Sequence, residues 1–179
     1  MGALLGAGGA VDRDELLTQW MEQYGTRILH LAYFYLKDRH LAEDVAQEVF
    51  LRAYRHMDSF RGDSAVYTWL YRIAVNVCRD RARSPWWRRV TLPGQLPLAT
   101  GGEFPEEAAV QADRRQAVLE HVLALPVHYR EVLVLYYYQD LSTGDIARVL
   151  DLPENTVKTR LHRARQQLRD ALSARGVTA

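Results

Sequence analysis

The chain has only one cysteine, Cys78, among its 179 residues. A single cysteine cannot form an intrachain disulfide, so a small scaffold held together by disulfides is excluded. This cysteine usage fits the cytoplasm better than an oxidising compartment. Cys78 lies in a stretch of apolar and basic residues, and we interpret it as a small half-buried side chain rather than a redox thiol.

Long apolar runs are missing as well. No run approaches the roughly 20 residues that a transmembrane helix needs, so we expect no insertion into a membrane. The N-terminus has neither the basic start nor the long apolar core of a signal peptide. Residues 1–11 are mostly small and include many Gly and Ala, and we expect them to form a flexible tail.

Prolines are scarce outside one stretch. Four of the six prolines and three of the eleven glycines lie within residues 85–107. Such a stretch breaks regular structure, and a loop of this length is unusual inside one compact domain. The sequence therefore predicts two small domains, residues 12–84 and 108–173, joined by a flexible linker, with residues 174–179 as a tail.

The formal net charge is only +1, but the charges are unevenly distributed. Residues 61–90 contain seven Lys and Arg against two acidic residues, and residues 152–179 contain six against two. The other two stretches, residues 1–60 and 91–151, are net acidic. Two separate basic segments predict two contacts with a polyanion, although ordinary solvated helix surface is the alternative.

Apolar residues recur at spacings of three and four along both halves, and no strand pattern is found, so the predicted fold is all-α. Gly62 permits a turn, and Asp63 or Ser64 is suited to cap the helix that follows it. Ser142 followed by Asp145 resembles a capping box. Helices are expected from residue 12 to at least residue 32, and at residues 38–56, 65–83, 108–125, 126–140, 142–150 and 154–172.

The last of these helices has the strongest functional signal. A short capped helix and a three-residue turn precede it, which predicts a helix-turn-helix that binds duplex DNA. Arg, Asn, Gln and Thr bond base edges, and Lys and Arg neutralise phosphates. An amphipathic surface helix in a bundle is the alternative. The expected contacts are Pro153, Glu154, Asn155, Thr156, Lys158, Thr159, Arg160, His162, Arg163 and Arg165, opposite the apolar stripe of Val157, Leu161, Ala164 and Leu168.

Several motifs together resemble the extracytoplasmic-function (ECF) sigma factors of the sigma-70 family, over about residues 24–172. Residues 42–50 (AEDVAQEVF), 60–64 (FRGDS) and 68–76 (TWLYRIAVN) are similar to region 2 of that family. Residues 125–133 (LPVHYREVL), 142–150 and 156–165 (TVKTRLHRAR) are similar to region 4.

The resemblance implies two helical domains that bind core RNA polymerase, through its β′ clamp helices and β flap, and recognise a promoter. Region 4 would read the −35 element in the duplex, with the residues named for the last helix. Region 2 would read and melt the −10 element, on the non-template strand. The resemblance also implies an anti-sigma factor as regulator and a regulon for stress or envelope functions. It implies no catalysis, cofactor or metal.

The resemblance assigns roles within region 2. Flipping a base costs a few kcal/mol of stacking, so a pocket for it has to restore hydrogen bonds and stacking. Carboxylates that face a basic partner helix would orient the complex and speed association. The expected polymerase contacts are Asp44, Gln47, Glu48 and Leu51, whose alternative role is a solvated helix face. The expected −10 contacts are Phe60, Arg61, Gly62, Asp63, Ser64, Ala65, Tyr67, Arg72, Asn76, Arg79 and Arg83.

Six further tryptophan and arginine positions lie near these contacts. Trp69 is interpreted as core rather than as a stacking platform for bases. Arg81, Arg88 and Arg89 would extend the basic track for phosphates. Trp86 and Trp87 would stack on DNA or pack against the polymerase or a regulator.

Three residues depart from the commonest family pattern. Gly144 lies inside the first helix of the helix-turn-helix, where glycine costs about 1 kcal/mol against alanine. Thr143 stands where the family often has an aromatic residue. His162 lies among the arginines of the last helix, so the contact that it makes is open. These departures bear on promoter preference more than on the family.

Three other functions compete with this interpretation. A transcription regulator that binds duplex DNA without polymerase would explain the helix-turn-helix but not the resemblance of residues 60–76. A small helical hydrolase is disfavoured, because the six histidines show no metal-ligand spacing and no phosphate-binding glycine loop is found. An adaptor such as an anti-sigma antagonist would not need the basic last helix.

Overall fold

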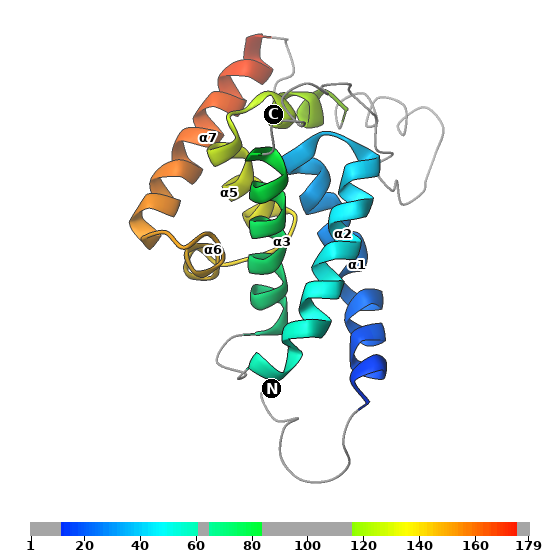
Figure 1. The fold of residues 1–179 in the computed structure, drawn as a ribbon. Coiled ribbons are helices and arrows are strands. Elements are labelled where there is room, and N and C mark those ends of the chain that lie inside the picture. Colours follow the sequence, from blue (N-terminus) through cyan, green and yellow to red (C-terminus); the bar gives the residue numbers. More distant parts are fainter. Residues whose placement is uncertain (1–11, 61–64, 84–115, 175–179) are drawn as a thin grey trace, which may run out of the picture. The chain divides into compact units, whose positions relative to one another are not determined.

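The computed structural model describes residues 12–60, 65–83 and 116–174. Five expectations lie outside these residues: the N-terminal tail, the linker, the loop at 61–64 with its capping residues, the start of the helix expected at residue 108, and the C-terminal tail from residue 175 on. The helices run as α1 Arg13–Leu36, α2 Arg39–His56, the 3-10 helix η1 Met57–Ser59, α3 Val66–Arg83, α5 Val127–Tyr137, α6 Thr143–Leu150 and α7 Glu154–Ala174, and residues 116–124 are also helical (Figure 1).

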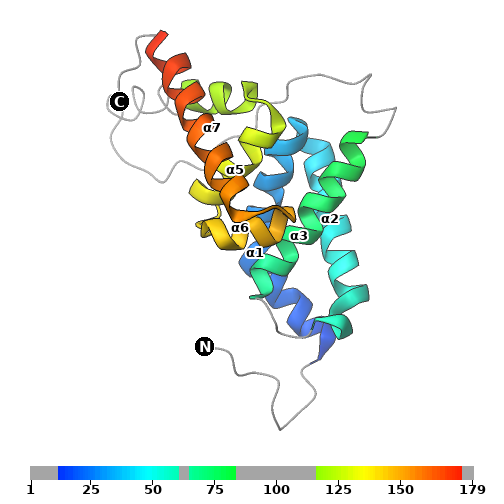
Figure 2. The ribbon, with the colours of Figure 1, turned by 90° about the vertical axis from the view of Figure 1, so that its left-hand side faces the viewer.

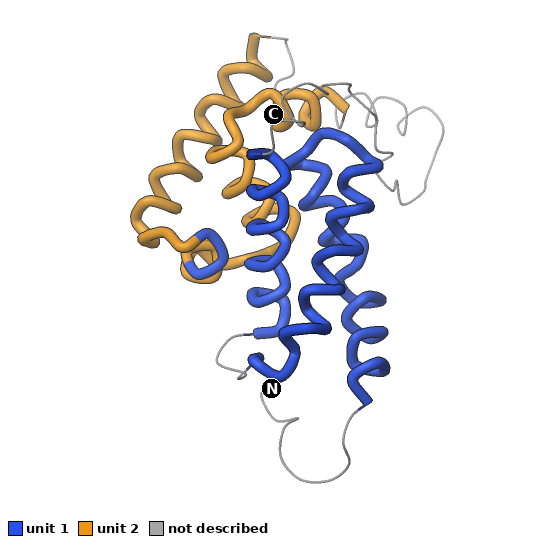
Figure 3. Tube along the Cα trace, viewed as in Figure 1, with its two compact units in different colours: residues 1–92, 148–150 blue, residues 93–147, 151–179 orange. Residues whose placement is uncertain are grey.

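The all-α fold is confirmed, since the described residues contain helices and turns but no strand. The chain divides into two compact units (Figure 3). Unit 1 comprises residues 1–92 with 148–150, and unit 2 comprises residues 93–147 and 151–179. None of the helices in the described part of the chain is both long and apolar enough to cross a lipid bilayer.

Unit 1 is a bundle in which α1 contacts both α2 and α3, and α2 contacts α3 (Figure 2). Polar caps set the helix ends. The Asp12 carboxylate accepts a hydrogen bond from the Asp14 backbone N–H, and the Asp38 carboxylate accepts one from Leu41. Such caps satisfy backbone donors that have no partner inside the helix. Lys37, with φ 58°, ends α1 in the left-handed conformation.

The core of unit 1 consists of the stripes that the spacing predicts, with residues such as Ile28, Val45 and Leu70 fully buried. Cys78 is buried completely, more deeply than the half-buried position expected from its basic neighbours. Burial raises the pKa of the Cys78 thiol to about 12. Because the thiolate is the reactive form, the thiol is inert at neutral pH, in agreement with a packing role.

In unit 2, α5 contacts α7, and Val132, Leu135 and Val157 lie in its core. α5 ends at Tyr137, three residues before the expected end, and α7 continues to Ala174, two residues beyond it. Such end differences are common, because the last turn of a helix depends on local capping.

α6 begins as the sequence predicts. The Ser142 hydroxyl accepts a hydrogen bond from the Asp145 backbone N–H at 3.1 Å and donates to the Asp145 carboxylate at 2.6 Å. The helix spans Thr143–Leu150, and its last three residues are grouped with unit 1. In Figure 1 α6 is seen nearly end-on whereas α7 runs across the view, so the two helices are not parallel.

Candidate functional site

The turn between α6 and α7 determines where the last helix starts. Asp151 takes the left-handed conformation with φ 56°, and the Leu152 N–H donates to the Ala147 carbonyl at 3.0 Å. This closes α6, and α7 starts after Pro153, whose carbonyl accepts from the Thr156 N–H at 2.9 Å. Proline tolerates this place because the first N–H groups of a helix lack partners anyway. A capped helix, a short turn and a long helix thus follow one another as expected.

The α7 helix separates its two faces as the spacing predicts. Val157, Leu161 and Ala164 are buried, and Leu168 is half-buried. The opposite side presents a reading face, which we define as the exposed residues Asn155, Lys158, Thr159, His162, Arg163 and Gln166. Of the other expected contacts, Pro153, Glu154 and Arg165 are exposed, and Thr156 and Arg160 are half-buried.

The expected DNA-contacting cations of α7 are in different electrostatic situations. Lys158 forms an ion pair with Glu154 at 3.0 Å. Hydrogen bonds from the Thr143 hydroxyl and from Lys158 lower the pKa of the exposed Glu154 carboxyl. Arg163 is exposed and makes no hydrogen bond or ion pair within the described part of the chain. Arg163 is therefore free to meet a ligand.

Two further cations of α7 are held by α5. The guanidinium of Arg160 pairs with the Glu131 carboxylate at 3.0 Å, and Glu131 is only 5% exposed. Arg165 donates to the Tyr137 hydroxyl at 2.9 Å, and its guanidinium lies 5.2 and 5.4 Å from the ring centroids of Tyr136 and Tyr137. The sequence analysis did not anticipate these contacts. The only local signal for the first is a glutamate that directly precedes the apolar run of α5.

On α2, three of the four expected partner-binding residues form one exposed stripe, which we call the α2 face. Asp44 and Gln47 are exposed, and Leu51 is 51% exposed although it is a large apolar residue. None of the three forms a hydrogen bond or ion pair in the described regions. An exposed leucine one turn from free polar groups suits a protein interface.

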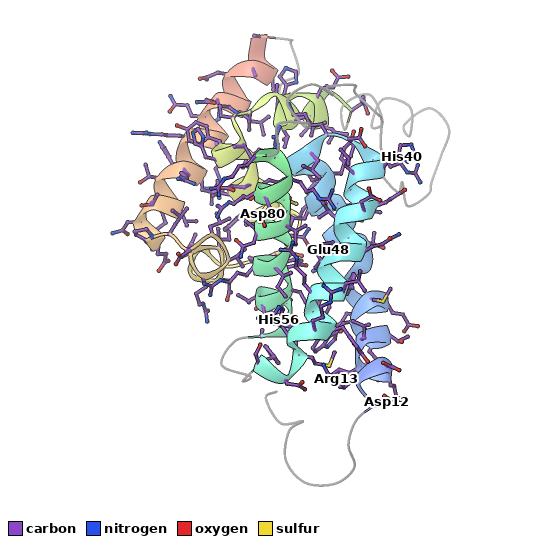
Figure 4. The ribbon with its side chains drawn as sticks, in the orientation of Figure 1. Asp12, Arg13, His40, Glu48, His56 and Asp80 are labelled. Atoms are coloured by element: carbon purple, nitrogen blue, oxygen red, sulfur yellow. The ribbon has the colours of Figure 1, made fainter. Side chains whose placement is uncertain are left out.

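Glu48, the fourth of these residues, has a partner inside unit 1. Its carboxylate pairs with Arg52 at 2.7 Å, and Arg52 also lies 3.7 Å from Asp80 on α3. Figure 4 labels Glu48 on α2 and Asp80 on the neighbouring α3. The hydrogen bond from Arg52 is the main reason why the pKa of Glu48 is lowered. Glu48 thus takes part in linking α2 to α3.

The helix α3 presents a second basic surface, which we call the α3 face. Arg72, Asn76, Arg79 and Arg83 follow one another at spacings of four, three and four, so they share one side of the helix. Arg72, Asn76 and Arg83 are exposed and Arg79 is half-buried. Ala65 and the half-buried Tyr67 lie at the start of the helix, whereas the expected contacts Arg61, Gly62, Asp63 and Ser64 lie outside the described residues.

An aromatic cluster holds the segment that ends at Phe60, shortly before α3 in the sequence. The Trp69 ring lies 5.2 Å from Phe60 and 5.8 Å from Trp20 on α1, and Trp20 is 6% exposed. Trp69 is half-buried in this cluster, consistent with its interpretation as core. Phe60, expected to contact DNA, is half-buried there too. Sequence analysis missed the cluster because its members lie on three separate elements.

Polar contacts hold the same segment at η1. Arg13, in the first turn of α1, pairs with Asp58 at 2.9 Å and donates to the Tyr54 carbonyl at 2.7 Å. Its guanidinium also lies 5.0 Å from the centroid of the Tyr54 ring. Figure 4 shows Arg13 at the end of α1 that lies beside the end of α2. The start of α1 therefore helps to fix the chain that leads to Phe60.

Family models match both halves of the chain. Residues 20–88 match Sigma-70 region 2, and residues 115–168 match Sigma-70 region 4. The two matches cover the α2 face, the α3 face and the reading face, in the order expected from the motifs.

Curated relatives match over most of their length. The chain is 39% identical to the ECF RNA polymerase sigma factor SigW of Bacillus subtilis over 158 residues, which covers 83% of this chain and 84% of the relative. It is 37% identical to the RNA polymerase sigma-H factor of Pseudomonas aeruginosa over 166 residues, covering 84% and 82%. It is 39% identical to the ECF RNA polymerase sigma-E factor of Escherichia coli K12 over 134 residues, covering 70% of each.

Two solved structures have a similar fold. CnrH, in complex with the cytosolic domain of CnrY, aligns with a TM-score of 0.66 at 26% identity over 90% of each chain. The sigma factor RpoE of Bartonella quintana, in complex with the anti-sigma factor NepR, aligns with a TM-score of 0.70 at 22% identity, covering 89% of this chain and 98% of that one.

Proposed function

This chain belongs to the extracytoplasmic-function group of the sigma-70 family, and from that premise we propose which of its surfaces performs each step of promoter recognition. As an RNA polymerase sigma factor it binds core polymerase and promoter DNA and acts in transcription initiation. The observation that supports the assignment of surfaces is that three exposed faces lie within the two matched regions: the α2 face, the α3 face and the reading face.

The reading face of α7 is the proposed −35 contact. Arg163 and Thr159 are exposed, and Arg163 has no partner in the described ranges. Arginine bonds the major-groove edge of guanine in two places, and a hydroxyl serves either base. The first turn of α7, from Glu154, also directs backbone N–H groups outward, where they suit a phosphate. His162 lies between these residues and is the proposed source of promoter preference.

The α3 face is the proposed −10 contact. Arginines and an asparagine on one side of α3 combine phosphate neutralisation with hydrogen bonds to an unpaired base. Phe60 and Tyr67 supply aromatic surface at the start of the helix, and base–aromatic stacking is worth about 1–3 kcal/mol per base. Arg61, Gly62, Asp63 and Ser64 complete the proposed contact by family resemblance.

The α2 face is the proposed contact with core polymerase. Asp44 and Gln47 are free to bond a basic partner, and Leu51 offers apolar surface one turn further along the helix. Glu48 is proposed to support this face through Arg52 as well as to add charge to it.

The wider proposals follow from the family. We place the protein in the cytoplasm, as a non-enzymatic factor without cofactor, and we propose an anti-sigma factor as its regulator and a stress or envelope regulon as its target. One of the similar folds was solved with an anti-sigma factor, which supports a regulator of this kind.

Run-off transcription tests the proposal as a whole. Purified chain and bacterial core polymerase are incubated with a library of genomic promoter fragments. We expect initiation from a subset of fragments that share an upstream and a downstream motif, and none without the chain. If the chain binds duplex DNA but starts no transcript on any fragment, the polymerase-independent regulator is the better interpretation.

Substitutions then test the surfaces separately. Arg163→Ala is expected to weaken binding to the upstream motif by about tenfold or more and to leave core binding unchanged. Asp44→Ala with Gln47→Ala is expected to weaken core binding in a pull-down without unfolding the chain. Glu22→Ala is the matched control, since Glu22 is an exposed carboxylate on α1. Core binding that survives the double substitution would overturn the assignment of the α2 face.

A further inference from the structure

Arg160 differs from the other cations of α7 in its place on the helix. It lies three residues after Val157 and four before Ala164, both buried, so it stands at the edge of the buried stripe. Its side chain is 26% exposed, whereas that of Lys158 is 57% exposed. Arg160 therefore points toward the core of unit 2 more than toward solvent.

The partner of Arg160 makes its charge unavailable. The Glu131 carboxylate is 5% exposed and lies 3.0 Å from the Arg160 guanidinium. An ionised carboxylate buried without a partner is strongly unfavourable, because it has lost its water and gained nothing in return. If Arg160 turned away to bond DNA, Glu131 would lose this ion pair while it stays buried.

A second contact ties α7 to α5 from the other side. Arg165 lies at the opposite edge of the buried stripe from Arg160, and it donates to the Tyr137 hydroxyl at 2.9 Å. The two α5 partners, Glu131 and Tyr137, stand almost two turns apart on that helix. Contacts at both edges of the stripe limit how far α7 turns about its own axis.

We propose that Arg160, through its buried pair with Glu131, is a positioning residue that sets the rotation of α7, and that it does not contact DNA itself. The inference rests on the proposed −35 contact and changes the role expected for one of its residues. A binding site works only when its groups are held near the productive geometry, within about 10–20°. The rigid planar guanidinium supports this role better than a flexible ammonium.

The test compares full-length variants bound to core polymerase. Wild-type holoenzyme first selects bound duplexes from a random pool, which yields the probe. Dissociation constants for that probe are then measured at several salt concentrations for Glu131→Gln, Arg160→Lys and Arg163→Ala. Far-UV circular dichroism at the assay temperature reports folding.

The Glu131→Gln variant separates the two roles by the sign of its effect. Glu131 is too buried to touch DNA, so its neutralisation acts through contacts inside unit 2, and the ion pair with Arg160 is one of these. If Arg160 positions α7, affinity falls, by about tenfold, since loss of the ion pair then loosens α7. If Arg160 bonds DNA, releasing it leaves affinity unchanged or raises it. Unchanged or raised affinity overturns the proposal.

The Arg160→Lys variant keeps both charges and decides the matter if Glu131→Gln fails to fold. For a positioning residue we expect weaker binding, an unchanged salt dependence and weakened preference at every base pair that α7 reads. If Arg160 contacts a phosphate, lysine would replace it with little loss of affinity. If Arg160 contacts a base, the preference would be lost at one base pair only. Either of the last two results overturns the proposal.

Arg163→Ala is the matched control on the reading face. It should weaken binding and relax the preference at the one base pair that Arg163 is proposed to read, because a base contact is removed. A wild-type holoenzyme that selects no sequence would instead refute the proposed function, so the two failures are distinguishable.

Discussion

The two units hold their functional helices in place by different means. In unit 1, aromatic rings from Trp20, Phe60 and Trp69 pack together, and the ion pairs between helices lie at the surface, as in Arg52–Asp80 with side chains 38% and 62% exposed. In unit 2, α7 is held by the buried pair of Glu131 and Arg160. In unit 1 the apolar core holds the helices in position, whereas in unit 2 a buried ion pair contributes to holding α7 in position.

The difference follows from the composition of the helices. α7 buries only the three residues Val157, Leu161 and Ala164, so its apolar contact is narrow and allows rotation. α1 buries eight residues, several of them aromatic. A narrow apolar stripe needs directional contacts to fix a helix, while large interlocking rings already do so.

The largest expected effect concerns the aromatic cluster. Trp20→Ala should lower the free energy of unfolding by about 4 kcal/mol, since it removes a buried ring and leaves a cavity beside Phe60 and Trp69. Urea unfolding followed by far-UV circular dichroism measures the loss. Trp20→Phe should retain more than half of the stability. A loss below about 1 kcal/mol for Trp20→Ala would mean that rings do not dominate unit 1.

The second effect concerns the buried pair. Glu131→Ala should lower the free energy of unfolding by about 3 kcal/mol. This value is near the low end for a broken buried ion pair, because Arg160 is 26% exposed. All four tryptophans lie at or before residue 87, so tryptophan fluorescence reports unit 1 and should show a nearly unchanged transition. The exposed Glu22→Ala is the control, with less than about 0.5 kcal/mol expected. If Glu131→Ala and Glu22→Ala lowered the free energy of unfolding equally, the buried pair would not hold unit 2 in the way proposed.

Glycine substitutions compare helix α1 with α6. Gly25 lies inside α1, and a Cβ there would meet nothing within 4 Å, so Gly25→Ala should stabilise the chain by up to about 1 kcal/mol. Gly144 lies in the first turn of α6, where an added Cβ would meet the Ser142 hydroxyl at 3.8 Å, an ordinary contact. Gly144→Ala should therefore stabilise the chain by less. Thermal unfolding measures both, and destabilisation by either would show that the glycine is required.

The surface ion pairs of unit 1 should matter little for stability. Arg52→Ala breaks the contacts with Glu48 and Asp80, yet we expect a cost below about 0.5 kcal/mol, because the three side chains are well solvated. Urea unfolding at low and high salt measures this. A cost comparable with that of Glu131→Ala would contradict the idea that unit 1 relies on its apolar core.

The smallest effect is a pH dependence in unit 1. Burial lowers the pKa of His30, so the unfolded state binds the proton more readily than the folded state. Stability is therefore full above the unfolded pKa of about 6.5 and falls as pH drops through it. Unfolding midpoints measured from about pH 8 to pH 5 should show this loss, and His30→Gln should reduce it. An identical pH profile for the variant would exclude His30 as the cause.

Much of the fold was predictable, for local reasons. Helix positions follow from apolar spacing and from caps such as Asp38 and Ser142, which involve residues three or four apart. The reading face follows from the same periodicity. The pairing of Arg160 with Glu131, 29 residues earlier, was not predictable, because it depends on how two helices meet. Its only trace in the sequence is a glutamate that directly precedes an apolar run.

The candidate surfaces also combine features that the sequence predicts with features that only the folded chain decides. Periodicity and family resemblance assigned Asp44, Glu48 and Arg160 to contacts with partners. Only the folded chain distinguishes Asp44, which is free within the described ranges, from Glu48 and Arg160, which have partners of their own. A charged residue on the polar side of a helix is available to a ligand only when it forms no ion pair or hydrogen bond with a neighbouring residue of the chain.

By itself, the sequence determined the helices, the helix-turn-helix and the family, since each depends on short-range spacing or on motifs in a set order. The tertiary structure alone decided which charges are free and which hold helices together. Packing removes water from some side chains and not from others, and an ion pair that has lost its water becomes part of the structure.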